Sequence, residues 1–238
     1  MGPDQTVITA PASRAWGQIR PSRRGQTNLS QPEVRLTILR VIRDHLQDPK
    51  AAGTWCDHDL DFTGAVFDGG DFSGAVFSGG QVTFDYATFS GGQVTFDDAT
   101  FSGGLVTFDD ATFSGGQVTF DFARFSGGLV TFADATFSGG QVTFDFARFS
   151  GGQVTFADAT FSGRLVTFRA ARFDGGQVDF DHARFDGGQV DFDRARFFGG
   201  QVTFDDARFD GGQVTFDDAT FSGGQVLRNG VAFRPAGP

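Results

Sequence analysis

Phenylalanine recurs along this chain at a fixed period, and that period limits what the chain can fold into. From Val82 onward a twelve-residue unit, Val-Thr-Phe-Asp-Asp-Ala-Thr-Phe-Ser-Gly-Gly-Gln, recurs about a dozen times, and a clean copy begins at Val94. Its Phe residues alternate between gaps of five and seven, as at Phe84, Phe89 and Phe96. Self-similarity at a short fixed period indicates a repeat protein, in which one small structural unit is stacked many times.

Each unit contains two very short segments suited to a β-strand. In Val-Thr-Phe and in Ala-Thr-Phe the outer two residues point to one side and Thr points to the other. The Asp-Asp and Ser-Gly-Gly-Gln segments between them are typical of turns. One unit alone cannot bury its Phe and Val, whereas stacked coils bury each of them against its counterpart about 4.8 Å above and below. Because burial of one Phe stabilises a fold by roughly 1.5–3 kcal/mol, the sequence predicts a β-solenoid.

A second periodicity, of twenty-four residues, indicates how much chain one coil uses. Residues 114–137 and 138–161 differ at one position only, Leu129 against Gln153. Two explanations stay open, a tandem duplication of two units and a solenoid coil as long as the duplicated segment, and both can hold because duplication of a whole coil preserves the packing. The alternative is a thin coil of one twelve-residue unit, in which two Phe side chains per coil would have to fit a narrow, close-packed interior.

Ahead of the twelve-residue units the Phe spacing is five, and a small or aliphatic residue precedes each Phe by two positions: Leu60 and Phe62, Ala65 and Phe67, Gly70 and Phe72, Ala75 and Phe77. This pattern resembles the pentapeptide-repeat family, in its Phe-rich actinobacterial variant. Residues 82–221 resemble the same family with a Gly-Gln insertion after every second pentapeptide. The resemblance implies an all-β fold, a right-handed quadrilateral β-helix whose four five-residue sides and two insertions give about twenty-four residues per coil.

Four segments are predicted along the chain. Residues 1–29 lack any period and are rich in Pro, Ser, Gln and Arg, which is typical of a disordered arm. Residues 30–56 form a capping α-helix and a linker, residues 57–227 form the solenoid, and residues 228–238 form a C-terminal tail. Residues 1–56 carry a net charge of +4 and the remainder carries −14, so a basic leader precedes an acidic body.

The predicted helix begins with the pattern of a capping box, Ser30 to Glu33, with Pro in its first turn, and ends near Leu46. One face contains Val34, Ile38, Val41 and Ile42, with Leu36, Leu39 and Leu46 nearby, while Arg35, Arg40 and Arg43 face elsewhere. We expect this helix to cover the first coil, since an open solenoid end exposes apolar side chains and strand edges. The alternative is a helix that binds a partner. At the other end Arg228 replaces a core Phe, and the last coil is either plugged by the tail or paired with a second copy in a homodimer.

The sequence contains no pattern typical of a catalytic, metal or cofactor site. Cys56 is the single Cys, and His45, His58 and His182 are scattered, whereas a structural zinc site needs four ligands. No segment approaches the roughly 20 apolar residues that cross a bilayer, and the N-terminus lacks the apolar stretch of a secretory signal. The expectation is a non-enzymatic, soluble, cytoplasmic protein without a cofactor or membrane insertion.

If one coil spans two of the twelve-residue units, outward side chains form columns along the rod. One column contains Arg124, Arg148, Arg172 and Arg196, and an acidic column contains Asp97, Asp121 and Asp145. Phe122 and Phe146 are also predicted to point outward beside the Arg residues. Exposed aromatic residues flanked by Arg are typical of protein interfaces, so these nine residues are the candidate interaction surface. The competing interpretation is a solvated face on which the Asp columns supply counter-charge to Arg.

The leading functional hypothesis is a non-enzymatic scaffold or protein-interaction module that presents an acidic rod surface with Thr, Asp and Arg columns to an unidentified protein partner. The family resemblance implies a second one, an acidic rod that mimics DNA and binds DNA gyrase, giving protection against an antibiotic or toxin. Two further hypotheses are ice binding by the Thr columns and nucleic-acid binding by Arg14, Arg20, Arg23 and Arg24 of the basic arm.

Overall fold

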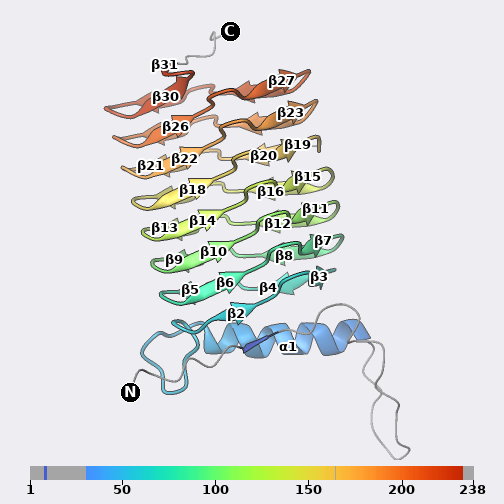
Figure 1. The fold of residues 1–238 in the computed structure, drawn as a ribbon. Helices are drawn as coiled ribbons and strands as arrows, with labels where there is room; N and C mark the ends of the chain where they lie inside the picture. Colours follow the sequence, from blue (N-terminus) through green and yellow to red (C-terminus); the bar gives the residue numbers. More distant parts are fainter. Residues whose placement is uncertain (1–7, 10–30, 164, 233–238) are drawn as a thin grey trace, which may run out of the picture.

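The computed structural model of the chain describes residues 8–9, 31–163 and 165–232. In these residues the repeats form four sheets that wrap around a single interior, preceded by one helix (Figure 1). The strands within each sheet are parallel, apart from the last pair of the first sheet. The predicted fold class, an all-β quadrilateral solenoid with an N-terminal helix, is confirmed.

Each sheet is formed by the strands that lie on the same side of successive coils. Sheet A contains β1 (Ile8–Thr9), β2 (Leu60–Asp61), β6 (Gln81–Thr83), β10 (Leu105–Thr107), β14 (Leu129–Thr131), β18 (Gln153–Thr155), β22 (Gln177–Asp179), β26 (Gln201–Thr203), β30 (Gln225–Arg228) and β31 (Val231–Ala232). Sheet B contains β3 (Val66–Phe67), β7 (Thr88–Phe89), β11 (Thr112–Phe113), β15 (Thr136–Phe137), β19 (Thr160–Phe161), β23 (Arg184–Asp186) and β27 (Arg208–Asp210). Sheet C contains β4 (Gly70–Asp71), β8 (Gln93–Thr95), β12 (Gln117–Thr119), β16 (Gln141–Thr143), β20 (Leu165–Thr167), β24 (Gln189–Asp191) and β28 (Gln213–Thr215). Sheet D contains β5 (Val76–Phe77), β9 (Thr100–Phe101), β13 (Arg124–Phe125), β17 (Arg148–Phe149), β21 (Arg172–Phe173), β25 (Arg196–Phe197) and β29 (Thr220–Phe221).

The register between coils is twenty-four residues, so each twelve-residue unit supplies half a coil. Val106 of β10 pairs with Val130 of β14, and Val118 of β12 pairs with Val142 of β16. The thin coil of a single unit is therefore wrong. The first coil is two residues shorter, since Leu60 pairs with Val82, because its five-residue period contains one insertion in place of two.

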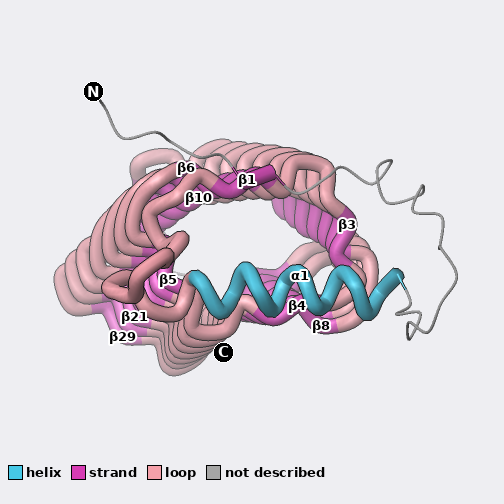
Figure 2. The backbone as a smooth tube through the Cα atoms, turned by 90° about the horizontal axis from the view of Figure 1, so that it is seen from below, coloured by secondary structure: helices cyan, strands magenta, loops and turns pink. Residues whose placement is uncertain are grey.

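The coil is right-handed. Seen from the end that carries the helix, the chain passes clockwise through sheets A, B, C and D while it moves away from the viewer (Figure 2). Sheet A lies opposite sheet C, and sheet B lies opposite sheet D. The corner between sheets A and B is consequently diagonal to the corner between sheets C and D.

Phenylalanine rings fill the interior in four columns, one behind each sheet. Every column contains seven rings, which accounts for 28 of the 32 Phe residues. Successive rings of a column lie parallel, as for Phe108 and Phe132, whose centroids are 4.6 Å apart at 7°. Rings of opposite columns meet edge to face, as for Phe120 and Phe132 at 6.0 Å and 88°. Both arrangements are favourable for aromatic quadrupoles.

The corners are of two kinds. The corners after sheets B and D contain the Gly pairs, as expected from the sequence, and Gly116 there has φ +71° with room for no side chain, since a Cβ would lie 2.2 Å from the carbonyl oxygen of Gly92. The corners after sheets A and C place a residue other than Gly at positive φ in every twelve-residue unit, for example Asp110 at +57° and Phe122 at +60°. A side chain in this conformation projects away from the rod.

The form of the Gly corner changes part-way along the rod. From Gly80 to Gly152 the second Gly of each pair has positive φ, and from Gly175 onward the first Gly does. Between them stands Arg164, where the other pairs have their second Gly. Arg164 itself lies outside the described residues.

Helix α1 (Gln31–His45) lies across the open end of the first coil, next to β4 (Figures 1 and 2). The prediction of the apolar face was wrong in part. The buried residues are Leu39, Ile42 and Leu46, which pack on the Phe columns, whereas Ile38 and Val41 are exposed. The buried set is spaced by three and four residues, so the helix is rotated to place this narrower stripe over the coil.

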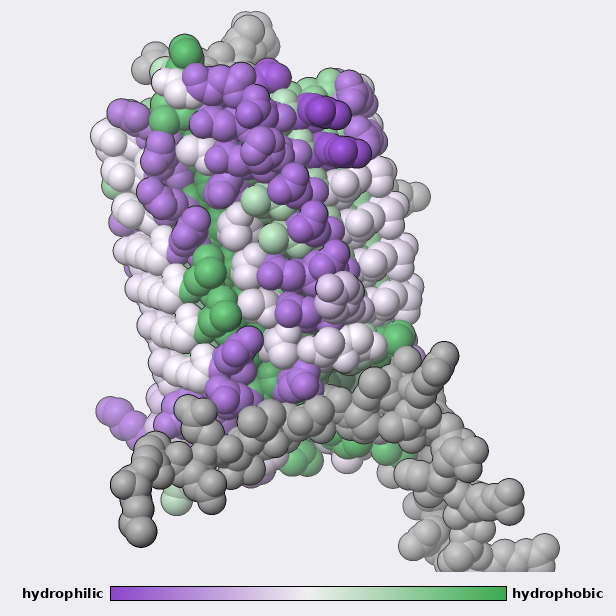
Figure 3. All heavy atoms as spheres, viewed as in Figure 1, coloured by the Kyte–Doolittle hydropathy of each residue, from purple (hydrophilic) through white to green (hydrophobic). Residues whose placement is uncertain are grey.

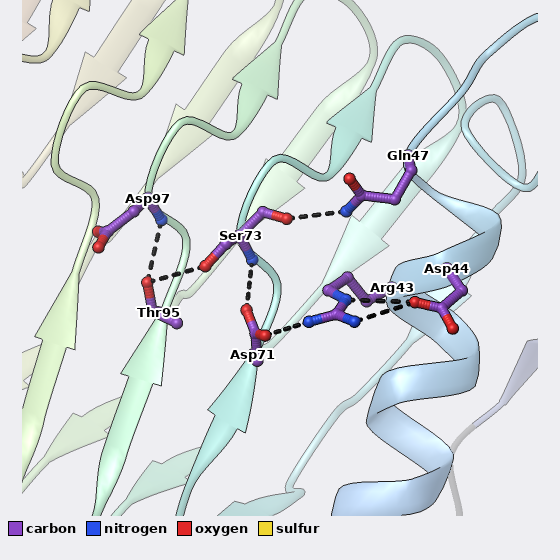
Figure 4. A network of polar contacts seen from close by, with 7 residues as sticks. All are labelled: Arg43, Asp44, Gln47, Asp71, Ser73, Thr95 and Asp97. Atoms are coloured by element: carbon purple, nitrogen blue, oxygen red, sulfur yellow. Dashed lines mark hydrogen bonds and ion pairs between the residues drawn. The ribbon is translucent and has the colours of Figure 1, made fainter.

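Two Arg residues of α1 also face the solenoid, contrary to expectation. The Arg35 guanidinium lies 3.3 Å from the Asp68 carboxylate, and that of Arg43 pairs with Asp71 (Figure 4). Their long side chains reach the rim of the first coil. Ser30, the first residue of the predicted capping box, and nearly all of the predicted arm lie outside the described residues. Of the arm, the structure describes Ile8–Thr9, which pair with β2. No helix in the described part of the chain is long and apolar enough to cross a membrane.

At the far end, the chain turns back in a hairpin of β30 and β31. Arg228, which stands at a core Phe position, donates to the carbonyl oxygen of Ala207 at 3.3 Å and lies over the ring of Phe209. Phe221 is 37% exposed at the rim. A homodimer formed through this end stays a prediction.

The Phe columns give the first testable prediction. Phe132 is fully buried between Phe108 and Phe156, whereas Phe146 is 55% exposed. We expect Phe132→Ala to lower the free energy of unfolding in urea by about 3–5 kcal/mol, because it removes ring contacts and leaves a cavity. The matched Phe146→Ala change should cost about 1 kcal/mol or less. Equal losses for the two variants would contradict the column packing.

Candidate interaction surface

Strands β13, β17, β21 and β25 of sheet D carry the Arg column. Each consists of an Arg followed by a Phe, and because the Phe is buried in the interior the Arg points outward. Arg124 pairs in register with Arg148, Arg148 with Arg172, and Arg172 with Arg196. The structure thus brings the four Arg residues into one column, one coil apart.

Phe122 and Phe146 lie on the corner between sheets C and D, two residues before Arg124 and Arg148. They are 53% and 55% exposed, and their rings stack on each other with centroids 5.0 Å apart at 5°. Their positive φ turns both rings away from the interior. Two aromatic rings therefore stand exposed in water beside the Arg column.

The acidic column does not supply counter-charge to these Arg residues. The carboxylate of Asp97 accepts the backbone N–H of Asp121 at 3.0 Å, and the carboxylate of Asp121 accepts that of Asp145 at 3.0 Å. The hydroxyl of Thr167 donates to Asp145 at 2.7 Å. These carboxylates therefore accept hydrogen bonds from backbone N–H groups and from a hydroxyl group of the neighbouring coil, within the wall of the solenoid.

As a result, most of the Arg column has no carboxylate partner. Among the described residues, Arg172 pairs with Asp174 at 3.1 Å, and no carboxylate lies within 4.0 Å of Arg124, Arg148 or Arg196. The expectation of a face neutralised by Asp–Arg pairs is wrong for these three Arg residues. The reason is that the neighbouring Asp side chains are turned along the wall toward backbone N–H groups.

Three residues outside the candidate set extend the surface. Arg169 stands where the acidic column continues and lies 3.8 Å from Asp191, and Arg194 takes the corner position of Phe122 three coils further on. Phe198 is 42% exposed, and the guanidinium of Arg172 lies 5.4 Å from its ring centroid, a cation–π contact. Alignment of the sequence at the period of one coil shows Arg169 as a departure from a column of Asp and Phe198 as a departure from a column that is mostly Ser, whereas the column of Arg194 has no prevailing residue. The Arg–Phe face is defined as Phe122, Arg124, Phe146, Arg148, Arg169, Arg172, Arg194, Arg196 and Phe198.

An acidic edge lies diagonally across the rod from the Arg–Phe face, on the corner between sheets A and B. It contains Asp85, Asp109, Asp110, Asp134, Asp158, Asp181, Asp205 and Asp206. Neither Lys nor Arg occurs at these corner positions. In Figure 3 a hydrophilic band runs along the rod beside the face of sheet A. Asp110, Asp134 and Asp158 are exposed and follow one another at intervals of one coil.

The described residues do not form a site suited to metal binding or to ice binding. No group of three or more His, Cys, Asp or Glu side chains there could hold a metal ion. The Thr columns predicted from the sequence lie on opposite sheets, A and C, and their members Thr107, Thr119 and Thr143 are buried. A further column on sheet B, which contains Thr112 and Thr136, is half-buried and offers one Thr per strand. A flat face with two exposed ranks of Thr, which ice binding would need, is not present in this part of the chain.

A family profile described as pentapeptide repeats, in nine copies, matches residues 62–112 and 151–196. Among solved structures, the chain is similar to HetL, a pentapeptide-repeat protein involved in heterocyst differentiation regulation in the cyanobacterium Nostoc sp. strain PCC 7120. The identity is 14%, with 68% of this chain and 84% of HetL covered and a TM-score of 0.16. It is also similar to QnrB1, a plasmid-mediated fluoroquinolone resistance protein, at 14% identity, with 69% and 82% covered and a TM-score of 0.18. No curated protein gives a significant match.

The wall carboxylates generate a prediction about pH. Burial raises the pKa of Asp121, an effect that outweighs the favourable contact with the Thr143 hydroxyl and the hydrogen bond from the backbone N–H of Asp145. Because the folded protein then binds a proton more readily than the unfolded chain, stability falls as the pH rises from the unfolded pKa through the folded pKa. We expect Asp121→Asn to raise the free energy of unfolding at neutral pH, since the amide oxygen still accepts the N–H of Asp145.

The difference from the wild type should vanish well below pH 3.8, the ordinary pKa of this group, because the carboxyl is then protonated in both states. Urea unfolding across this pH range measures it, with the exposed corner residue Asp98, changed to Asn, as control. A less stable Asp121→Asn variant at neutral pH would show that the charge strengthens the wall.

Proposed function

We propose that this chain, which belongs to the pentapeptide-repeat family, is a non-enzymatic interaction scaffold that binds a macromolecular partner on its Arg–Phe face. The observation that carries the proposal is the stacked pair Phe122 and Phe146, exposed beside Arg side chains that have no carboxylate partner among the described residues. Aromatic residues and Arg are the types most enriched at the centre of protein interfaces. The cytoplasmic location expected from the sequence is part of this proposal.

The solenoid supplies a rigid support for such a surface. Each side chain of the face stands on a strand or corner whose backbone is hydrogen-bonded to neighbouring coils, as for Arg148 N–H to the carbonyl oxygen of Ala123 at 2.8 Å. Little conformational freedom of the backbone is left to lose when a partner binds, which favours affinity. The hollow at the far end of the rod is lined by Phe221, Val226 and Leu227 with Gly, Gln and Ala residues, none of which has an ionisable side chain. This lining supports a binding role over catalysis, because a catalytic site needs groups that act as nucleophile, acid or base.

A photo-crosslinking residue placed on the face tests the proposal. We expect Phe122→p-benzoylphenylalanine to crosslink reproducibly to one macromolecule in a lysate of the producing organism, because the ring is exposed on the face beside Arg124. Arg124→Ala with Arg148→Ala in the same chain should abolish that product. Mass spectrometry of the crosslinked band identifies the partner.

The matched control is the change Thr136→p-benzoylphenylalanine, because Thr136 points outward from sheet B, away from the Arg–Phe face. Equal crosslinking from both positions, or a product that persists after the Arg changes, would rule out the Arg–Phe face as the binding site.

DNA gyrase is a second candidate partner, and the acidic edge is the observation that favours it. The eight Asp residues form a narrow line of negative charge along the rod. One strand of a DNA duplex carries one phosphate charge per roughly 3.4 Å, whereas one corner residue per coil gives a sparser line, with one charge per about 4.8 Å. The Arg–Phe face counts against this candidate, since a mimic of DNA would present acidic surfaces throughout.

A supercoiling assay separates the two candidates. If gyrase binds the acidic edge, the wild type should alter supercoiling or protect it from a quinolone, and the triple change Asp110→Asn, Asp134→Asn and Asp158→Asn should lose most of the effect. Arg124→Ala with Arg148→Ala serves as the control and should keep it. No effect of the wild type at large molar excess would remove gyrase from consideration.

A further inference from the structure

We propose that the Arg–Phe face binds the acidic edge of a second copy of this chain, so that rods associate side by side. The inference rests on the proposed function, because it names the partner of the same face. It follows from three observations, which concern the spacing of the two charged columns, their positions around the rod and their heights along it.

The column of Arg residues and the column of Asp residues have the same spacing, because each repeats once per coil. Arg124, Arg148 and Arg172 follow each other at one coil, and so do Asp110, Asp134 and Asp158. Adjacent coils in such a stack are about 4.8 Å apart. Few other partners repeat a charge at this interval over several steps: an extended peptide repeats on one side about every 6.6 Å, and an α-helix about every 5.4 Å. A second copy matches the interval at every coil.

The positions around the rod allow a simple arrangement. The acidic edge and the Arg–Phe face lie on diagonally opposite corners (Figure 2). A copy displaced sideways along this diagonal, without rotation, therefore places its acidic edge against the Arg–Phe face of the first. The contact uses two different surfaces, so a third copy can add to the pair and a row of rods can form.

The heights along the rod also agree. Within one coil the chain passes Asp110 and then Arg124, and the next two coils repeat this with Asp134 and Arg148 and with Asp158 and Arg172. Copies at the same level thus bring three Arg residues opposite three Asp residues. On the following coil Arg196 and Arg194 meet the corner formed by Asp181 and His182. The exposed rings of Phe122 and Phe146 lie within the contact, beside Arg124 and Arg148, and lose water there.

Long-range charge opposes this contact, since each copy carries −10. At about 0.15 M salt the Debye length is roughly 8 Å, so repulsion between distant charges is largely screened while ion pairs in direct contact are screened less. Association is therefore expected at this ionic strength and should weaken at about 1 M, where the Debye length is about 3 Å.

Sedimentation velocity of the full chain tests the proposal. For the wild type at about 0.15 M salt, where charges beyond roughly 8 Å are screened, we expect the weight-average sedimentation coefficient to rise with protein concentration. The reversal of Arg124, Arg148 and Arg172 to Asp should abolish the rise, and so should the reversal of Asp110, Asp134 and Asp158 to Arg. Circular dichroism and thermal unfolding verify that both triple variants are folded.

The decisive sample is an equimolar mixture of the two triple variants. Each reversed residue changes the charge by two units, so the variants carry −16 and −4 against −10 for the wild type. Both remain net negative, so general attraction between opposite charges does not operate. In the mixture each intact surface nevertheless finds its complement, and association should return to the wild-type level.

A control variant adds negative charge elsewhere. Ser114→Asp, Ser138→Asp and Ser162→Asp lie on the corner between sheets B and C, which the contact leaves free and where Asp186 and Asp210 already occur. This variant should associate like the wild type.

Three outcomes would overturn the inference: a wild type that stays monomeric at every concentration, association that survives either triple reversal, or a mixture that stays monomeric. The last would indicate a different mode of self-association if the wild type does associate. None of these outcomes affects the crosslinking of Phe122 to another macromolecule, so failure of this inference can be distinguished from failure of the proposed function.

Discussion

Stacking of phenylalanine rings between successive coils is the interaction on which the rest of the structure depends. Each strand has only two to four residues, too few to be stable alone, and the strands persist because every inward Phe is held against the rings of the neighbouring coils. The rings lie parallel within a column and edge to face across the interior, as in Phe96 with Phe120 and Phe108 with Phe120. This packing fixes the register between coils, and the register in turn aligns every outward side chain.

The polar backbone groups in the wall between interior and solvent need hydrogen-bond partners, which the aromatic columns do not supply. Backbone N–H groups at the corners after sheets A and C need acceptors, and Asp carboxylates one coil away supply them, as Asp85 does for the N–H of Asp109 at 3.1 Å. An unpaired polar group at a half-buried site would cost stability. Much of the acidity of the rod is therefore structural, and the Arg residues stand beside carboxylates that are already engaged.

Sequence reasoning predicted the parts of the fold that depend on period. The positions of the Phe columns, the four sides, the length of one coil and the Arg column all follow from spacing and from the family resemblance. It did not predict the turning of Asp121 along the wall, because a repeated Asp at a corner is compatible with either a solvated or a hydrogen-bonded role. It also misplaced the buried stripe of α1, since Ile38 and Leu39 are equally apolar and only the docking against the first coil decides between them. The candidate surface was predicted in part, since Phe122 and Arg124 were included. Phe198 was not, because it is an exception in a column that is mostly Ser, and Arg194 was not, because its column has no prevailing residue.

The near-identity of residues 114–137 and 138–161 has a consequence for how such a surface can change over generations. A copying error that duplicates the codons of one whole coil adds that coil intact, because the new coil meets the same neighbours on both sides. The same event adds one more Phe, Arg and Asp to the outer columns in correct alignment. The number of binding contacts on the surface can thus increase by one coil at a time without passing through a misfolded form. Selection can then act on the number of contacts while the geometry of each contact is unchanged.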